Sequence, residues 1–496
     1  MKNKKGLLIR ALLLLLSFSV LLVCFAGCKK DEEGENAQTS GSVSTNGGVA
    51  EEGMIKDNLP DDLDYGGTEL SIYAWNSSVT EFEVEELNGI AIDEAVYNRN
   101  LTVCERLGVK LKYNFFTDSD AYKYPGIIAL SQSGGEAYDI LAGHTRSMAL
   151  CTTQGLLLDL GNIEGSYLDF EKPWWNSSII EKISVGNTFY TCTGDIAPSL
   201  VQMAYCIYFN EDMINQNQME SPYDLVADNE WTLENMLEMN INFYFDNNNN
   251  TVVDIADKVP LVGANWDWPA LLHGCGVGIV DKDVTGAFVL NSDFIGEKSI
   301  EVMEMLADTI QLDGAIVNDS DMEAVGSFMG QRSLFLITQS GRAASHFADV
   351  TFQYGCVPCP KYDSDQTDYI STARQPVSLF GLSKSVSKDR LVMISAVMEC
   401  FASEGYRQTT PVIFDQIMKY QKSASAEMSE MLTVIRDTVW FDCGRIYMAD
   451  LSGVCDKVGM ILRDEQSWST YLDGTVKTTV KNQLKDLSNT LIKVAS

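Results

Sequence analysis

The feature that most constrains the fold is an alternation of strand-like and helix-like patterns between residues 70 and 141. The expected order is strand 70–75, helix 91–107, strand 109–116, helix 122–131 and strand 138–141. Within the first helix, Ile92, Val96, Val103 and Leu107 recur at helical spacing, and Gly108 is placed to end it. Successive strands separated by helices pair in parallel, so the sequence predicts a parallel sheet with helices on both faces.

A second α/β unit is expected from about residue 211 to 350. Strand-like stretches at 188–193 and 203–209 precede it, and Asn210 and Thr232 are expected to cap helices. A strand at 333–337 closes the unit. After a strand at 379–382, Ser387 is expected to cap a helix, and residues 407–496 are expected to be mainly helical.

The amino end has the pattern of an export signal. Four basic residues precede an apolar run over 11–25, and this pattern is typical of a signal peptide over residues 1–27. Phe25-Ala26-Gly27-Cys28 resembles the lipobox of bacterial lipoproteins, although Phe25 stands where that pattern usually has Leu. The resemblance implies cleavage before Cys28 and lipid on its sulfur. The alternative is an ordinary secretory signal with an incidental cysteine.

The residues after Cys28 predict a flexible tether. Residues 29–58 are rich in Glu, Asp, Ser, Gly and Asn and have almost no large apolar side chain. A segment of this composition buries too little apolar surface to offset the conformational entropy lost on folding. We expect the folded part to begin near Leu63.

The charge of the chain restricts its ligands. It has 36 Lys and Arg against 69 Asp and Glu, a net charge of −33. Cleavage of the signal would remove four of the basic residues and make the remaining chain still more acidic. A surface this acidic repels nucleic acid and anionic substrates, whereas neutral and cationic ligands remain possible.

The cysteines are expected to be mostly free thiols. Ten remain after Cys24 and Cys28, and several lie in apolar runs where a thiol behaves as a small hydrophobe. Cys356 and Cys359 have the spacing of a redox or zinc motif, but no second pair or nearby histidine completes four ligands. Cysteines within a strand are the favoured interpretation.

An ordered set of short motifs resembles the extracellular solute-binding proteins of family 1. In chain order the motifs are Trp75, residues 92–99, Tyr138-Asp139-Ile140, Pro173-Trp174-Trp175-Asn176, Gly194-Asp195, Tyr208-Phe209-Asn210, residues 221–225, Trp231-Thr232, residues 328–335, residues 358–362, Tyr406 and Asp442. The resemblance covers roughly residues 66–450 and rests on the order of many weak motifs. Proteins of this family are lipoproteins that deliver carbohydrates to ABC importers.

The resemblance implies a fold class as well as a function. The expected class is α/β, a two-lobed periplasmic-binding-protein-like fold of type II. Each lobe would be a sheet flanked by helices, with crossing hinge strands between them. The expected first lobe is 59–203 with 360–420, and the second is 204–359 with 421–496. The lobes would close on a ligand bound in the cleft.

The candidate ligand residues are aromatic and polar side chains near strand ends. A sugar offers hydroxyls to polar groups and an apolar face to an aromatic ring. The candidates are Trp75, Asp139, His144, Trp174, Trp175, Asp195, Trp266, Asp267 and Trp268. For most of them, core packing or capping is the competing interpretation. If 174–175 is extended, neighbouring side chains point oppositely, so one tryptophan should be exposed to the cleft.

Residues 246–257 are the best candidate metal site. Asp246, Asn248, Asn250, the carbonyl of Val252, Asp254 and Asp257 occupy the ligand positions of an EF-hand-like loop. Thr251 replaces the glycine of the sharp turn, and Asp257 replaces the longer glutamate. The expected result is weak structural calcium, and an Asn-rich turn without metal is the alternative. No cofactor is required.

An enzyme is the weaker hypothesis. The histidines His144, His273 and His346 form no metalloprotease motif, and no nucleophile elbow is present. Residues 385–388 satisfy SxxK without its partner motifs, and sequence alone does not exclude a carboxylate pair of a glycoside-active enzyme. The favoured function is a monomeric, lipid-anchored extracellular receptor for a sugar or oligosaccharide, with an ABC permease as its partner. A receptor for peptides or another cationic or neutral solute is the alternative.

Overall fold

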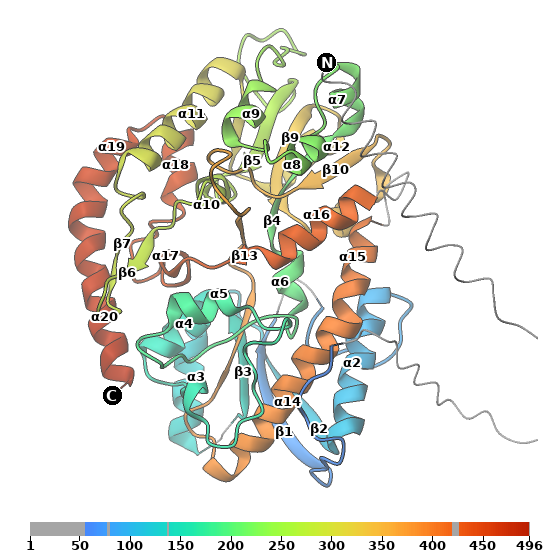
Figure 1. Cartoon of the computed structure of the whole chain (residues 1–496), viewed down its shortest axis with the longest axis vertical. Helices are drawn as coiled ribbons and strands as arrows, with labels where there is room; N and C mark the ends of the chain where they lie inside the picture. The colour runs from blue at the N-terminus through green and yellow to red at the C-terminus, as the bar shows by residue number, and fades with distance from the viewer. Residues whose placement is uncertain (1–54, 77–79, 136–137, 419–425, 496) are drawn as a thin grey trace, which may run out of the picture. The chain divides into compact units, whose positions relative to one another are not determined.

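A computed structural model of the chain describes residues 55–76, 80–135, 138–418 and 426–495. Lys56–Ser496 form one unit, which contains every element described below (Figure 1). The predicted signal peptide, Cys28 and the tether up to residue 54 lie outside the described residues. Among the helices of the described ranges, none combines the length and the apolar composition of a membrane span.

The first sheet has the strand order β12-β3-β1-β2. Its strands are β1 (Thr68–Trp75), β2 (Val109–Phe116), β3 (Ile140–His144) and β12 (Ser378–Leu382). β1 is parallel to both of its neighbours, whereas β12 joins β3 antiparallel from far along the chain. The predicted parallel β-α-β-α-β unit is therefore confirmed.

The second sheet has the strand order β10-β4-β9-β5-β8. Its strands are β4 (Tyr205–Asn210), β5 (Val259–Ala264), β8 (Ile316–Asn318), β9 (Ser333–Gln339) and β10 (Tyr354–Val357). β5 is parallel to β8 and β9, and β4 is antiparallel to β9 and β10. Every residue of β4, β5 and β9 is buried, as expected for strands covered on both faces.

Helices flank both sheets. Beside the first sheet lie α2 (Ala91–Leu107), η1 (Ala121–Lys123), α3 (Tyr124–Gly134), α4 (Thr145–Thr153), η2 (Leu160–Asn162), α5 (Ser177–Ile183), η4 (Lys388–Arg390) and α14 (Leu391–Glu404). Beside the second lie α7 (Glu211–Gln216), α8 (Pro222–Ala227), α9 (Leu233–Glu238), α10 (Pro269–Gly274), α11 (Glu297–Asp313), α12 (Asp321–Met329), α13 (Arg342–His346), η3 (Phe347–Asp349), α16 (Ala426–Asp437) and α18 (Lys457–Arg463). The chain ends with α19 (Trp468–Tyr471), η6 (Leu472–Val480) and α20 (Lys481–Ala495), and α20 packs against α4 and the hairpin β6 (Val280–Lys282) and β7 (Phe288–Leu290).

Three segments cross between the two sheets. The first includes α6 (Pro198–Gln202) and leads into β4, and the second runs from β11 (Ser371–Thr372) into β12. The third is the helical run α14, η5 (Gly405–Thr409) and α15 (Thr410–Met418), continued by α16, β13 (Val439–Trp440) and α17 (Cys443–Ile446). A bridge between Ala204 and Ala373 joins the first two segments, and pairing of β11 with β13 joins the second to the third. The predicted two-lobed fold with crossing strands is confirmed.

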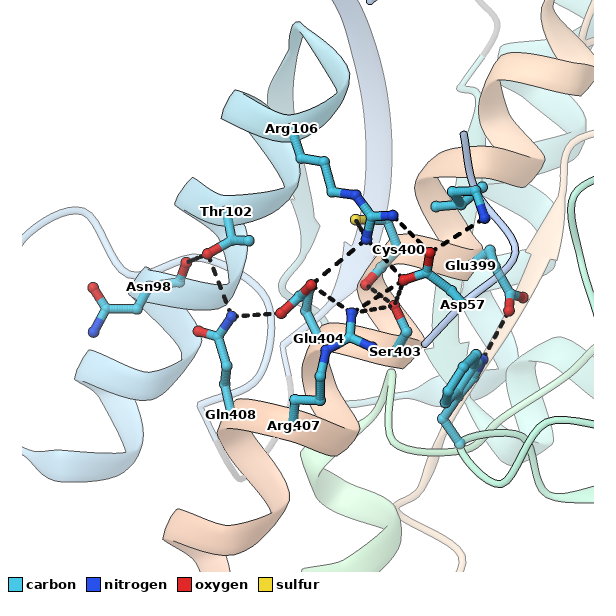
Figure 2. Close-up of polar contacts among 12 residues, drawn as sticks. Asp57, Asn98, Thr102, Arg106, Glu399, Cys400, Ser403, Glu404, Arg407 and Gln408 are labelled. Atoms are coloured by element: carbon cyan, nitrogen blue, oxygen red, sulfur yellow. Dashed lines mark hydrogen bonds and ion pairs between the residues drawn. The ribbon is translucent and has the colours of Figure 1, made fainter. Parts of the chain in front are cut away.

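The helical part of the third crossing is held to the amino end of the body. Asp57, whose side chain is only 2% exposed, accepts bonds from Arg106 on α2 at 2.6 and 2.7 Å and from Arg407 on η5 at 3.1 Å. Ser403 on α14 donates to the same carboxylate at 2.8 Å. Figure 2 shows Asp57 enclosed by these side chains. We refer to Asp57, Arg106, Ser403 and Arg407 as the Asp57 clamp.

The structure differs from the sequence expectations at the start of the folded body and between residues 188 and 193. Asp57 and the buried Leu59 already belong to the folded body, which therefore begins before Leu63. Residues 188–193 form isolated bridges, such as Cys192 with Phe380, and no named strand. By contrast, α2 has the predicted bounds, and Gly108 ends it in the left-handed region at φ 59°.

Candidate functional site

The carboxyl ends of the parallel strands lie beside the second crossing segment. In the first sheet these ends are Trp75 and His144, and in the second they are followed by Trp266, Asp321 and Arg342. Open α/β sheets bind their ligands at such ends. Arg374, Gln375 and Ser378 of the crossing segment contact both groups. The first candidate region is therefore where the two sheets meet.

On the second sheet, Asp321 is the centre of a network. Its carboxylate accepts bonds from Trp266 Nε1 at 2.6 Å, Arg374 Nη1 at 2.6 Å and Arg342 Nη2 at 3.1 Å. The Arg374 guanidinium also lies 5.5 Å from the Trp266 ring centre and donates to Gln339 at 3.0 Å. The half-buried indole of Trp266 is thus fixed at its N–H and on one face.

On the first sheet, Trp75 and His144 lie together. Trp75 Nε1 donates to Ser378 Oγ at 2.7 Å, and the two rings meet edge to face at 5.3 Å. His144 Nδ1 accepts the backbone N–H of Arg146 at 3.0 Å, and burial lowers the pKa of His144 to about 3. His144 is therefore neutral at physiological pH and caps α4.

Unpartnered polar atoms occur in the same region. Among the described residues, the buried atoms without a hydrogen-bond partner include Arg146 Nε, Gln202 Oε1 and Arg445 Nε. Arg146 donates through Nη2 to Gln375 at 2.7 Å, and Gln375 donates to the carbonyl of Arg445 at 2.9 Å. Buried polar groups normally have partners, so the unpartnered nitrogens of Arg146 and Arg445, which are connected through Gln375, mark a place suited to a polar ligand.

A cavity of about 350 Å³ lies beside the first and third crossing segments. Its walls are Pro173, Trp174, Trp175, Asn176, Ser177, Ser178, Gly194, Asp195, Leu200, Val201, Tyr406, Arg436, Asp437 and Val439. This volume is at the lower end of the roughly 300–1,000 Å³ of small-molecule sites. Aromatic, carboxylate, amide and hydroxyl groups in one wall are the groups that contact sugars. The cavity is the second candidate region.

Trp174 and Trp175 both point to one carboxylate. Trp174 Nε1 donates to Glu399 Oε1 at 2.9 Å, and Trp175 Nε1 donates to Glu399 Oε2 at 2.8 Å. Both residues are buried, so the expectation that one is exposed is wrong. The backbone is not extended here, because Trp175 N–H bonds to Lys172 O in a turn at 3.1 Å.

Asp195 is buried in the same wall. Its carboxylate accepts bonds from Arg436 Nη2 at 2.5 Å and Thr410 Oγ1 at 2.5 Å. Burial raises the pKa of Asp195, and Arg436 opposes that rise. Gly405 allows the close approach of η5, because a Cβ there would lie 2.0 Å from the Asp195 carbonyl oxygen. Asp195 therefore joins the first crossing segment to the third.

The remaining predicted ligand residues lie elsewhere. Asp139 precedes β3, at the opposite end of the sheet from Trp75, and both of its oxygens accept bonds from Arg390 at 2.7 and 2.8 Å. Trp268 is fully buried and donates to Gly263 O at 3.3 Å. Asp267 is buried behind Trp266, accepts the Ala264 N–H at 3.0 Å, and has its pKa raised to about 7 by burial. Their roles in binding stay predictions.

The loop 246–257 is closed by its own hydrogen bonds. Asn248 and Asn250 donate to Asp254, and the buried Asp257 accepts the N–H groups of Asn247 and Asp254. Thr251 takes the left-handed conformation at φ 62°, at the position where an EF-hand has glycine. No group of three or more His, Cys, Asp or Glu in the described ranges is arranged to hold a metal ion. Asp246, Asn248, Asn250, Val252, Asp254 and Asp257 would be the calcium ligands, and their role stays a prediction.

Several residues of the site were not singled out from the sequence. They are Arg146, Asp321, Arg342, Arg374, Gln375, Glu399 and Arg436. Asp321 and Arg342 each stand three residues after a strand ends, and that position could have indicated them. Glu399 and Arg436 lie on helices more than 200 residues from the partners they hold, and no local pattern indicates this.

Comparison with known proteins gives the family. Residues 92–377, more than half of the chain, match the family model described as bacterial extracellular solute-binding protein. The chain belongs to this family. The prediction from the ordered motifs is therefore confirmed. No curated protein sequence matches this solute-binding protein.

Solved structures share the fold of this solute-binding protein. A cyclic α-maltosyl-1,6-maltose binding protein from Arthrobacter globiformis is 13% identical, with a TM-score of 0.57 over 85% of this chain and 100% of that one. A cyclo/maltodextrin-binding protein complexed with maltotetraose is 11% identical, with a TM-score of 0.56 over 85% and 97%. The maltose-binding protein MalE from Listeria monocytogenes in complex with maltose is 12% identical, with a TM-score of 0.52 over 84% and 97%.

Proposed function

We propose that this protein captures a neutral oligosaccharide between its two lobes and delivers it to an ABC importer. The observation that carries the proposal is the meeting of aromatic and polar side chains from both sheets along the crossing segments. The named similar structures bind maltotetraose, maltose or a cyclic maltosyl sugar, which supports a carbohydrate as the ligand class.

The chemistry of the site suits a sugar. Trp75, Trp266 and Tyr406 offer partly buried rings, and Asp195, Arg374 and Gln375 offer groups for hydroxyls. The strongly acidic chain disfavours anionic ligands. Closure of the lobes follows only if the sugar binds the closed state more tightly than the open one.

A ligand panel tests the proposal. Maltotetraose, maltose, cello-, xylo- and manno-oligosaccharides and short cationic peptides would each be added to the protein, and thermal unfolding would be recorded. A sugar present at about 100 times its dissociation constant should stabilise the folded state by about 2.7 kcal/mol. Stabilisation by peptides and by no carbohydrate would favour the peptide receptor instead.

Two variants and a control make the panel specific. Asp321→Asn removes the charge that holds Trp266 and Arg374, and Asp195→Asn weakens the cavity wall. Each should reduce the ligand-induced shift, whereas the exposed Glu234→Gln should leave it unchanged. The sugars would also be analysed after incubation, because a receptor returns them uncut and a glycoside-active enzyme does not.

Lipid attachment at Cys28 is part of the same proposal. An anchored receptor stays close to its permease, which raises its local concentration there. Metabolic labelling with a palmitate analogue should mark the wild-type protein and not Cys28→Ser. Equal labelling of both would contradict the anchor.

A further inference from the structure

Glu399 is a buried carboxylate at the back of the cavity wall. It lies on α14 and is fully buried, and no ion pair within 4 Å involves it in the described ranges. Figure 2 shows Glu399 on the same helix as Ser403 of the Asp57 clamp, one turn before it. An unpaired buried charge is unfavourable, so its surroundings must explain it.

Three N–H groups surround this carboxylate. The two indole N–H groups of Trp174 and Trp175 reach separate oxygens at 2.9 and 2.8 Å, and the backbone N–H of Asp169 reaches Oε2 at 3.1 Å. An indole nitrogen only donates, and an ionised carboxylate only accepts. The ionised form therefore offers a full acceptor oxygen to each tryptophan. A protonated acid accepts more weakly at its hydroxyl oxygen, and an amide presents an NH₂ group that accepts no hydrogen bond.

We propose that Glu399 is a positioning residue for the ligand site, and that its ionised form fixes both cavity tryptophans in the arrangement that binds ligand. This rests on the proposed function, because the cavity is taken as part of the ligand site. Ligand affinity then depends on the charge of a residue that the ligand does not touch.

The ionisation of Glu399 falls in an accessible pH range. Burial raises its pKa to about 7, and the bonds from Trp175, Asp169 and Trp174 oppose that rise. Among the described residues, the titratable groups that act electrostatically on Glu399 or are acted on by it include Asp169 and Cys192, and Lys172 lies over the ring of Trp174 at 5.8 Å. Because the folded pKa is above the ordinary 4.5, the charge lowers stability as pH rises from about 4.5 to 7. Neutralising it should therefore leave the protein folded.

The central experiment compares wild type with Glu399→Gln at pH 8 and pH 6. Maltotetraose is the probe, and its affinity is measured by calorimetry. Wild type should bind more weakly at pH 6. At pH 8 the variant should bind about tenfold more weakly than wild type, because its amide NH₂ faces one indole N–H, and its affinity should change little with pH. The exposed Glu234→Gln should behave as wild type.

A ligand-free measurement separates this proposal from the proposed function. Indole fluorescence and near-ultraviolet circular dichroism of wild type should change with a midpoint near pH 7, and Glu399→Gln should show no such change. If maltotetraose does not bind wild type, this arm still decides the role of Glu399. A variant with wild-type affinity at both pH values and a wild-type indole titration would overturn the proposal.

A double variant tests the mechanism directly. In the double variant Trp175→Phe with Glu399→Gln, the side-chain oxygen of the glutamine can accept a hydrogen bond from Trp174. Its NH₂ group then meets no second indole donor. Adding Glu399→Gln to Trp175→Phe should therefore reduce affinity less than adding it to wild type. Equal reductions in both backgrounds would mean that Glu399 acts independently of the paired tryptophans.

Discussion

At the residue scale, the buried pair of Asp195 and Arg436 joins two crossing segments through one carboxylate. Arg436 also donates to the exposed Asp437 and to the carbonyl of Pro173, so it keeps two partners if Asp195 is changed. Thr410 would keep a polar neighbour in an asparagine variant but not in an alanine variant. The contribution of Asp195 is therefore best measured with both substitutions.

We predict that Asp195→Ala lowers the free energy of unfolding by roughly 3 kcal/mol, at the lower end for a broken buried pair. Asp195→Asn should lower it less. Urea unfolding at pH 7 measures both values. If the alanine variant were as stable as wild type, the pair would not hold the crossing segments together.

The tryptophan pair shows why single side chains are the hardest part to predict. The sequence singled out Trp174 and Trp175 as ligand residues, and both line the cavity, but the assumed extended backbone gave the wrong directions for their side chains. Their actual directions depend on a turn at Lys172 and on Glu399, which is more than 220 residues away in the chain. Such a partner is fixed only by the packed fold.

At the scale of elements, the helical run α14, η5 and α15 serves two sites at once. Glu399, Tyr406 and Thr410 belong to the cavity region, and Ser403 and Arg407 belong to the Asp57 clamp. The π-helical turn η5 contains Tyr406 of the first set and Arg407 of the second, and such turns often occur at functional sites.

We predict that the Asp57 clamp stabilises the protein only while Asp57 is ionised. Burial alone would raise its pKa, but the bonds from Arg106, Ser403 and Arg407 outweigh burial and hold the pKa well below the ordinary 3.8. Its contribution is therefore present above about pH 4 and is lost as pH falls further. Asp57→Asn should lower the free energy of unfolding by roughly 3 kcal/mol at pH 7, the lower end for a broken buried pair.

Unfolding of wild type and Asp57→Asn at pH 7 and pH 3 tests this sign. The difference between the two proteins should shrink at pH 3. A difference that stayed constant or grew on acidification would contradict the assigned charge state. The exposed Asp389→Asn provides a charge-matched control.

The loop 246–257 gives a second prediction at this scale. Calcium must displace the bonds that Asn248 and Asn250 make to Asp254, and the loop has few charges. We therefore expect a dissociation constant of roughly 1 mM, in the range of weak extracellular sites. Calorimetry should show this heat for wild type and not for Asp254→Asn. Absence of heat in wild type at millimolar calcium would exclude the site.

Helices and strands were predicted better from the sequence than the distant segments with which they pair. α2 matches its predicted bounds because its apolar spacing and Gly108 are local signals. The parallel order of β1, β2 and β3 follows from the alternation along the chain. The place of β12 in the first sheet has no local signal, because β12 arrives from more than 230 residues beyond β3.

At the scale of the whole molecule, three crossings between two sheets predict a ligand-driven closure. We expect the radius of gyration of the protein in solution to decrease when a sugar that binds it is added in excess, because closure brings the lobes together. Small-angle X-ray scattering with and without the sugar measures it. A ligand that binds without any such decrease would mean that the free protein is already closed.

Burial of the thiols has a practical consequence for watching that motion. Of the ten cysteines in the described ranges, nine are buried and Cys104 is partly buried, and burial raises the pKa of Cys104. Maleimide dyes react with exposed thiolates, so these side chains should label slowly. Cysteines introduced at the exposed Leu130 and Leu312, beside different sheets, would then accept a donor and an acceptor dye. Energy transfer between single pairs of dyes could follow opening and closing without first removing any native cysteine from the body.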